Sequence, residues 1–150
     1  MRIALWLHVL GTVLWVGGMF FAHVALRPAL QAVPPTTRLP LVSATLATFF
    51  GWVAAAVAVI LVTGFSMVVA LGGFARVGYY VHVMTALGLV MTAIFAFIVA
   101  RPFAVLRRSV ASSAWEPAGA AAGAIRRLVA VNLVLGLVTI TVAILGHNVV

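Results

Sequence analysis

The chain has 150 residues, of which 66% are hydrophobic and only 7% are charged, and its mean hydropathy is +1.31. Soluble domains are roughly a quarter charged, so a soluble fold of this chain would lack the polar surface that keeps it dissolved. The formal net charge is +8, with one acidic residue, Glu116, and no cysteine. This composition excludes paired-carboxylate catalysis, carboxylate-rich metal sites, disulfides and covalent haem attachment.

Four apolar stretches follow one another along the chain, and none contains Asp, Glu, Lys or Arg: residues 3–26, 45–71, 79–100 and 128–146. A bilayer core about 30 Å thick requires about 20 apolar residues per helix, so each stretch is long enough to cross it. Such long runs do not match the short alternating segments of a membrane barrel. We predict a single all-α domain over residues 1–150, an integral membrane four-helix bundle.

The connections between the stretches carry most of the nine arginines and all six prolines. Arg27-Pro28 and Arg101-Pro102 are expected to end the first and third helices, because proline interrupts a helix. Residues 31–40 and 109–124 are expected to be cytoplasmic loops, and residues 72–78 a short turn. Cytoplasmic loops collect arginine, and the first and third connections hold seven arginines against two elsewhere. Both termini are therefore predicted to be extracytoplasmic, and the charge requires no nucleic acid partner.

The chain contains an internal repeat. His8-Val9 recurs 74 residues later as His82-Val83, and the same offset places Arg27-Pro28 on Arg101-Pro102. This pattern predicts a duplicated helical hairpin, with two parallel copies related by a pseudo-two-fold axis along the membrane normal.

Histidines are the main candidates for chemistry, since polar residues inside membrane spans are rare and often functional. His8, His82 and His147 are expected at one extracytoplasmic level, and His23 near the cytoplasmic face. Two imidazoles on facing helices suit the axial positions of a b-type haem. We therefore predict a haem b held by His8 and His82, serving electron transfer or redox chemistry; an enzyme of this kind would be a membrane oxidoreductase.

The predicted surroundings of the haem share a helical face with one of the two histidines or lie at the outer surface near the propionates: Gly11, Thr12, Trp15, Met19, Thr85, Ala86 and Arg76. A copper site is the alternative, because imidazole and thioether ligands suit copper. It would consist of His8, His82 and His147, assisted by Met84 or Met19. The sequence leaves open whether His147 or His23 is a ligand.

The segments Leu7-His8-Val9-Leu10, Trp15-Val16-Gly17-Gly18 and Leu26-Arg27-Pro28 resemble the opening of the membrane domain of the copper-resistance CopD family. More distantly, they are similar to the HemJ family of protoporphyrinogen oxidases. The CopD resemblance implies a bacterial inner-membrane protein linked to copper handling, with His8, Trp15 and His82 as matched positions. The HemJ resemblance implies a porphyrinogen oxidase. Expected partners are the lipid bilayer, a quinone or redox protein, and further copies or subunits of a membrane complex.

Overall fold

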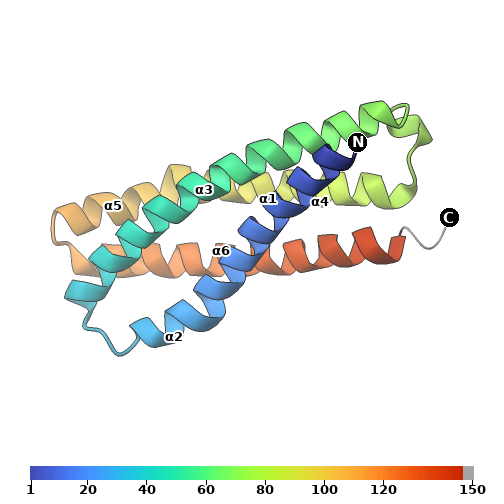
Figure 1. The fold of residues 1–150 in the computed structure, drawn as a ribbon. Helices are drawn as coiled ribbons and strands as arrows, with labels where there is room; N and C mark the ends of the chain where they lie inside the picture. Colours follow the sequence, from blue (N-terminus) through green and yellow to red (C-terminus); the bar gives the residue numbers. More distant parts are fainter. Residues whose placement is uncertain (147–150) are drawn as a thin grey trace.

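The computed structural model describes residues 1–146, and all regular elements in this part are helical (Figure 1). The first rod comprises α1 (Arg2–Phe21), a π turn (Ala22–Leu26) and α2 (Arg27–Leu30). The second is α3 (Pro35–Ala70), followed by a 3-10 turn (Phe74–Arg76). The third comprises α4 (Tyr79–Ile98), a π turn (Val99–Phe103) and α5 (Ala104–Ala111), and the fourth is α6 (Trp115–Gly146). Each of the four rods is long and apolar enough to cross a membrane, which confirms the predicted helical membrane bundle.

The Arg-Pro pairs do not end the helices, and this part of the sequence prediction is wrong. The first rod continues through Pro28 to Leu30, and the third through Pro102 to Ala111. Proline lacks an amide hydrogen, and its ring collides with the carbonyl four residues earlier. A wider π turn relieves both effects. One π turn directly precedes Arg27-Pro28, and the other contains Arg101-Pro102. Both hairpins therefore have a π turn at their Arg-Pro pair.

The connections on the arginine-rich side are shorter than predicted. Residues 31–40 and 109–124 were expected as loops, but α3 begins at Pro35 and α6 at Trp115. Proline suits the first turn of a helix, where its missing amide hydrogen is not needed. Residues 118–124 are mostly alanine, the strongest helix former. Glu116 lies in the first turn, where a negative charge interacts favourably with the helix dipole. Local helix preference therefore extends both rods beyond the apolar stretches.

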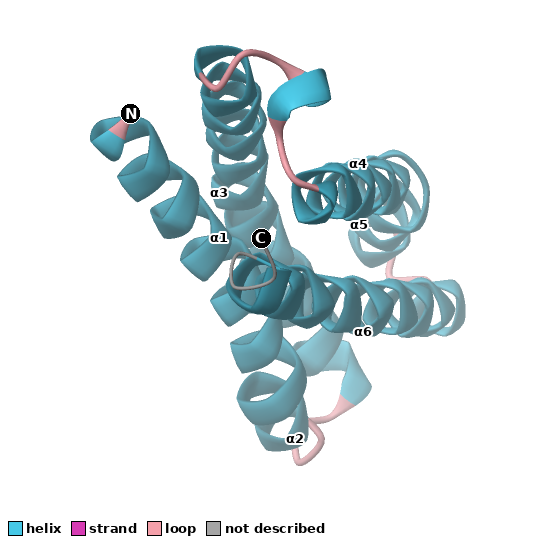
Figure 2. Cartoon of the chain, turned by 90° about the vertical axis from the view of Figure 1, so that its right-hand side faces the viewer, coloured by secondary structure: helices cyan, strands magenta, loops and turns pink. Residues whose placement is uncertain are grey.

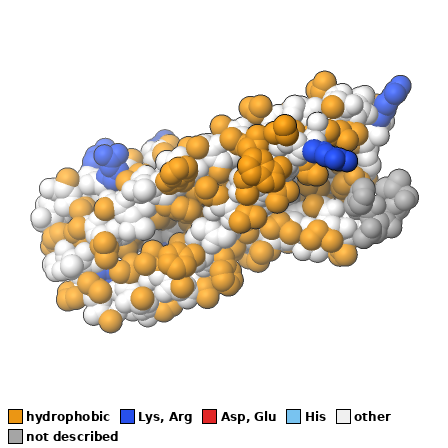
Figure 3. All heavy atoms as spheres, viewed as in Figure 1, with side chains coloured by type: hydrophobic (Ala, Val, Ile, Leu, Met, Phe, Trp, Pro, Cys, Tyr) orange, Lys and Arg blue, Asp and Glu red, His pale blue; other side chains and the backbone are white. Residues whose placement is uncertain are grey.

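The bundle is assembled from two packed hairpins, α1 against α3 and α4 against α6. The N-terminus, the α3–α4 connection and the end of α6 lie at one end of the molecule, and the α2–α3 and α5–α6 connections lie at the other (Figure 1). Seen end-on, α1 leans away from the other rods as it approaches α2 (Figure 2). On the face drawn in Figure 3, hydrophobic side chains cover the middle of the rods and the basic side chains lie toward the two ends.

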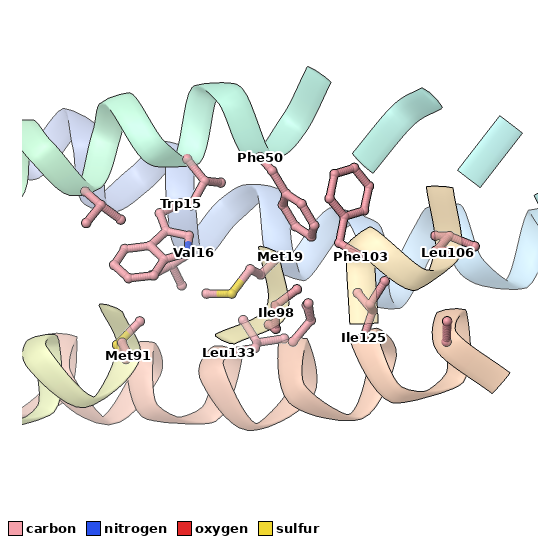
Figure 4. Close-up of a cluster of buried hydrophobic side chains, with 14 of the residues drawn as sticks. Trp15, Val16, Met19, Phe50, Met91, Ile98, Phe103, Leu106, Ile125 and Leu133 are labelled. Atoms are coloured by element: carbon pink, nitrogen blue, oxygen red, sulfur yellow. The ribbon is translucent and has the colours of Figure 1, made fainter. Parts of the chain in front are cut away.

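An apolar core fills the middle of the bundle, where all four rods meet (Figure 4). Aromatic rings join three of the rods by edge-to-face contacts, with centroids 6.2 Å apart for Trp15 and Phe95, 5.6 Å for Phe50 and Phe95, and 5.0 Å for Phe50 and Phe103. The fourth rod adds aliphatic side chains, including Leu133. Edge-to-face geometry is the arrangement that aromatic quadrupoles favour, so this core fixes the relative positions of the rods.

Gly11 makes the α1–α3 contact close. A Cβ atom at Gly11 would lie 2.9 Å from Cγ1 of Ile60 and 3.3 Å from the backbone oxygen of Ala56. We expect Gly11→Leu to lower the stability of the bundle by about 1–3 kcal/mol, because the rods must separate to admit the side chain. Thermal unfolding in detergent measures the effect. Gly17→Leu on the same helix is the control, since a Cβ there meets nothing within 4 Å; equal losses in both variants would contradict the prediction.

Candidate metal-binding cavity

The end of the bundle that holds the N-terminus contains a cavity of about 300 Å³ between α1, α3, α4 and α6, here called the outer cavity. Its walls are mostly apolar, and His8 is the histidine among its lining residues. Of the predicted site residues, Thr12, Trp15 and Thr85 also line it. The structure thus brings four of the predicted residues to one place.

The His8 ring is held against α3 through one nitrogen. Nδ1 lies 3.0 Å from the carbonyl oxygen of Ile60 and 3.1 Å from Oγ1 of Thr63. A carbonyl oxygen can only accept, so Nδ1–H donates, and the lone pair of the neutral ring is on Nε2. Thr63 donates its own hydroxyl hydrogen to the carbonyl oxygen of Val59, at 2.6 Å. These contacts fix the orientation of the imidazole and leave Nε2 without a hydrogen-bond partner among residues 1–146.

Gly64 allows the ring to lie this close to α3. A Cβ atom at Gly64 would lie 3.2 Å from Cε1 and 3.6 Å from Nδ1 of His8. Any larger residue would crowd the imidazole, which would have to shift by a few tenths of an ångström.

Three methionines line the outer cavity with His8: Met67, Met84 and Met91. They are three of the four methionines that follow Met1. Sequence reasoning identified Met84 and Met19 as close to histidines, but Met19 is buried in the apolar core. Met67 and Met91 were missed. The seven-residue spacing of Met84 and Met91 was an available signal, because it places both side chains on one face of a helix.

His82 does not line the outer cavity. It is exposed, and its ring lies against Phe74 with centroids 5.5 Å apart. The repeat predicted that His8 and His82 lie at matching depths, but depth does not determine the direction of a side chain around the helix axis. On α4, Thr85 and Gly88 face the cavity, and His82 faces elsewhere.

The other predicted haem neighbours lie away from the outer cavity. Ala86 and Arg76 are exposed, Gly11 is buried in the α1–α3 contact, and Met19 is buried in the core. His147 lies outside the described residues, and His23 lines a different cavity at the opposite end of the bundle. Within residues 1–146 there is no cluster of three or more His, Cys, Asp or Glu side chains that could hold a metal. Among the described residues, the nitrogen and sulfur ligands that line the outer cavity are therefore one imidazole and three thioethers.

Asn132 of α6 is a buried polar residue that sequence reasoning missed. It is 1% exposed, and its Nδ2 donates a hydrogen bond to the backbone oxygen of Met91 at 3.1 Å. Its Oδ1 has no partner among the described residues. The signal was present, since Asn132 is the only asparagine inside a predicted span.

Neither the curated proteins nor the solved structures contain a match to this chain. The family model described as copper resistance protein D matches residues 43–145, which is more than half of the chain. The match covers most of α3 and extends through α6, and it begins after the residues 7–28 whose resemblance to this family was noted from the sequence. Together with the four rods that can cross a bilayer, it makes the chain a multi-pass membrane protein. The chain belongs to the copper resistance protein D (CopD) family.

Proposed function

We propose that the protein binds copper, as Cu(I), in the outer cavity, and that it handles copper at the extracytoplasmic side of a bacterial inner membrane. The proposal is carried by one observation, the His8 ring whose Nδ1–H is bound to the Ile60 carbonyl while its cavity is lined by three methionines. Imidazole and thioether groups are ligands that suit Cu(I). The family match supports copper as the metal.

The contacts of His8 are those expected of a metal ligand. A ligating histidine usually donates its other ring N–H to a carbonyl or carboxylate, which fixes the tautomer and orients the ring. Ile60 and Thr63 supply such contacts here. Among residues 1–146, no carboxylate lines the outer cavity, so hard cations such as Mg²⁺ and Ca²⁺, which prefer oxygen ligands, find few ligands there.

The methionines lie at different depths. Met84 and Met91 are two helical turns apart on α4, or about 10 Å at 1.5 Å per residue. Thioether side chains are flexible, so each sulfur can adjust to an ion at its own depth without a large change in the backbone. Below Met91 the apolar core closes the bundle. We infer a site that receives copper from the extracytoplasmic side.

The residues as they lie do not support a haem b between His8 and His82, because only His8 lines the outer cavity. Electron transfer through such a haem, a quinone partner and a HemJ-like porphyrinogen oxidase activity remain predictions from the sequence. An absorption spectrum of protein from haem-replete cells tests the haem hypothesis directly: a Soret band lost in both His8→Ala and His82→Ala would favour it over our proposal.

Titration of the detergent-purified protein with Cu(I), in competition with a chromophoric chelator, tests copper binding. We expect one Cu(I) per chain and nitrogen and sulfur ligands in its X-ray absorption spectrum. Replacing Met67, Met84 and Met91 together by Leu should weaken binding by about tenfold or more, equivalent to about 1.4 kcal/mol. Met19→Leu is the matched control, because Met19 is buried like Met91 but does not line the outer cavity. An absence of Cu(I) binding, or equal weakening by Met19→Leu, would contradict the proposal.

A further inference from the structure

The opposite end of the bundle contains a larger cavity, of about 780 Å³, here called the inner cavity. It lies between the first rod, α3 and α6, where α1 and α2 diverge from the other rods (Figures 1 and 2). Glycines leave space in its α6 wall, since a Cβ atom at Gly119 or Gly123 would meet nothing within 4 Å. Its volume falls within the range of about 300–1,000 Å³ that is typical of ligand-binding pockets.

The rim of the inner cavity is strongly basic. Arg27, Arg38 and Arg126, from three different rods, line it together with His23, and no acidic residue does. The single acidic residue of the chain is Glu116, which is not among the lining residues. Within residues 1–146, no hydrogen bond or ion pair engages the three guanidinium groups. Guanidinium groups bind phosphate through paired N–H donors, so the rim is suited to a phosphate group.

The rest of the inner cavity is apolar and extends toward the middle of the bundle. It is lined by hydrophobic side chains that include Phe21, Leu46, Phe49 and Val129. Its inner limit is near Gly18, about two and a half turns of helix from Arg27 of the first rod. A ligand that fills the cavity must therefore carry a negative charge at one end and hydrocarbon at the other.

We propose that the inner cavity binds an anionic phospholipid, with its headgroup phosphate between the three arginines and an acyl chain in the apolar part. Basic pockets between transmembrane helices on the cytoplasmic side are suited to anionic headgroups. The arginine-rich end is the cytoplasmic end by the positive-inside rule. Such a lipid would fill the space between α1–α2 and α6 and so stabilise the position of the first rod, independently of copper binding in the outer cavity.

Native mass spectrometry of the full chain in detergent tests this site, with phosphatidylglycerol, phosphatidylcholine and inorganic phosphate as probes. We expect phosphatidylglycerol to remain bound where phosphatidylcholine and inorganic phosphate do not. Arg38→Gln and Arg126→Gln should each weaken its binding by roughly fivefold. Arg127→Gln is the matched control, because the neighbouring arginine carries the same charge but does not line the cavity.

A second variant separates the apolar part of the site from the charge. Gly123→Leu places a side chain in the inner cavity without changing the charge, and should weaken lipid binding, whereas Gly51→Leu, on the exposed side of α3, should not. Equal weakening by Arg127→Gln would show general attraction to a basic surface and would overturn the proposal. Inorganic phosphate that binds the wild type and Gly123→Leu alike would overturn it in favour of a soluble anion, and phosphatidylcholine that binds as well as phosphatidylglycerol would also overturn it.

Discussion

His8→Ala is expected to weaken Cu(I) binding by roughly 100-fold, equivalent to about 2.8 kcal/mol, while His82→Ala leaves the affinity within roughly twofold of the wild type. The difference follows from where the two imidazoles lie. His8 is held in the outer cavity by the Ile60 carbonyl, and His82 is exposed against Phe74. Competition titration with a Cu(I) chelator measures both affinities under the same conditions.

Thr63→Val is expected to have an intermediate effect. It removes the hydroxyl 3.1 Å from Nδ1 of His8 and keeps the Ile60 contact. It should therefore lower the Cu(I) affinity by about tenfold, the lower limit for the loss of a group that orients a metal ligand. If His82→Ala weakened copper binding as strongly as His8→Ala, the site would have to include both histidines, and the one-histidine site proposed here would be wrong.

Asn132→Asp is expected to destabilise the bundle strongly. The side chain is 1% exposed, and among residues 1–146 its Oδ1 has no hydrogen-bond partner and no basic side chain bonds to it. An ionised carboxylate in such surroundings costs several kcal/mol, so we expect a large drop in the thermal unfolding temperature in detergent and poor yield of folded protein at neutral pH.

Asn132→Leu is the control for this prediction. It removes the hydrogen bond to the Met91 carbonyl, but it also removes the unpaired oxygen, and interhelical hydrogen bonds in membrane proteins contribute on average about 0.6 kcal/mol. We therefore expect it to change stability by less than about 1 kcal/mol. An Asn132→Asp variant as stable as the wild type at neutral pH would show that water reaches this position, which the structure does not indicate.

The helical membrane architecture was predictable because it depends on hydrophobicity alone, which the four apolar stretches carry in full. The helix boundaries were not predictable. Because proline lacks an amide hydrogen, Pro28 and Pro102 predict helix ends, but the π turns that accommodate them have no signal in the sequence. The start of α6 at Trp115 likewise reflects the helix preference of residues 118–124, which precede the apolar stretch.

The candidate site was only half predictable. His8 was identified from the internal repeat, and Thr12, Trp15 and Thr85 from their helical spacing to His8 or His82; all four line the outer cavity. His82 was assigned by symmetry, which sets its depth but not its rotation around the helix axis. Met67 joins the site through the packing of α3, and no pattern within a single helix reveals which of its faces meets α1 and α4.

The aromatic core between the two cavities has a consequence for the cell's energy supply. Trp15, Phe50 and Phe95 lie across the middle of the bundle, with ring centroids 5.6–6.2 Å apart. A hydrated ion or proton would have to lose its water to pass such an apolar barrier. The copper ion and the phospholipid that we propose would then occupy the two cavities without opening a path for protons between them, and the membrane would keep its electrochemical gradient.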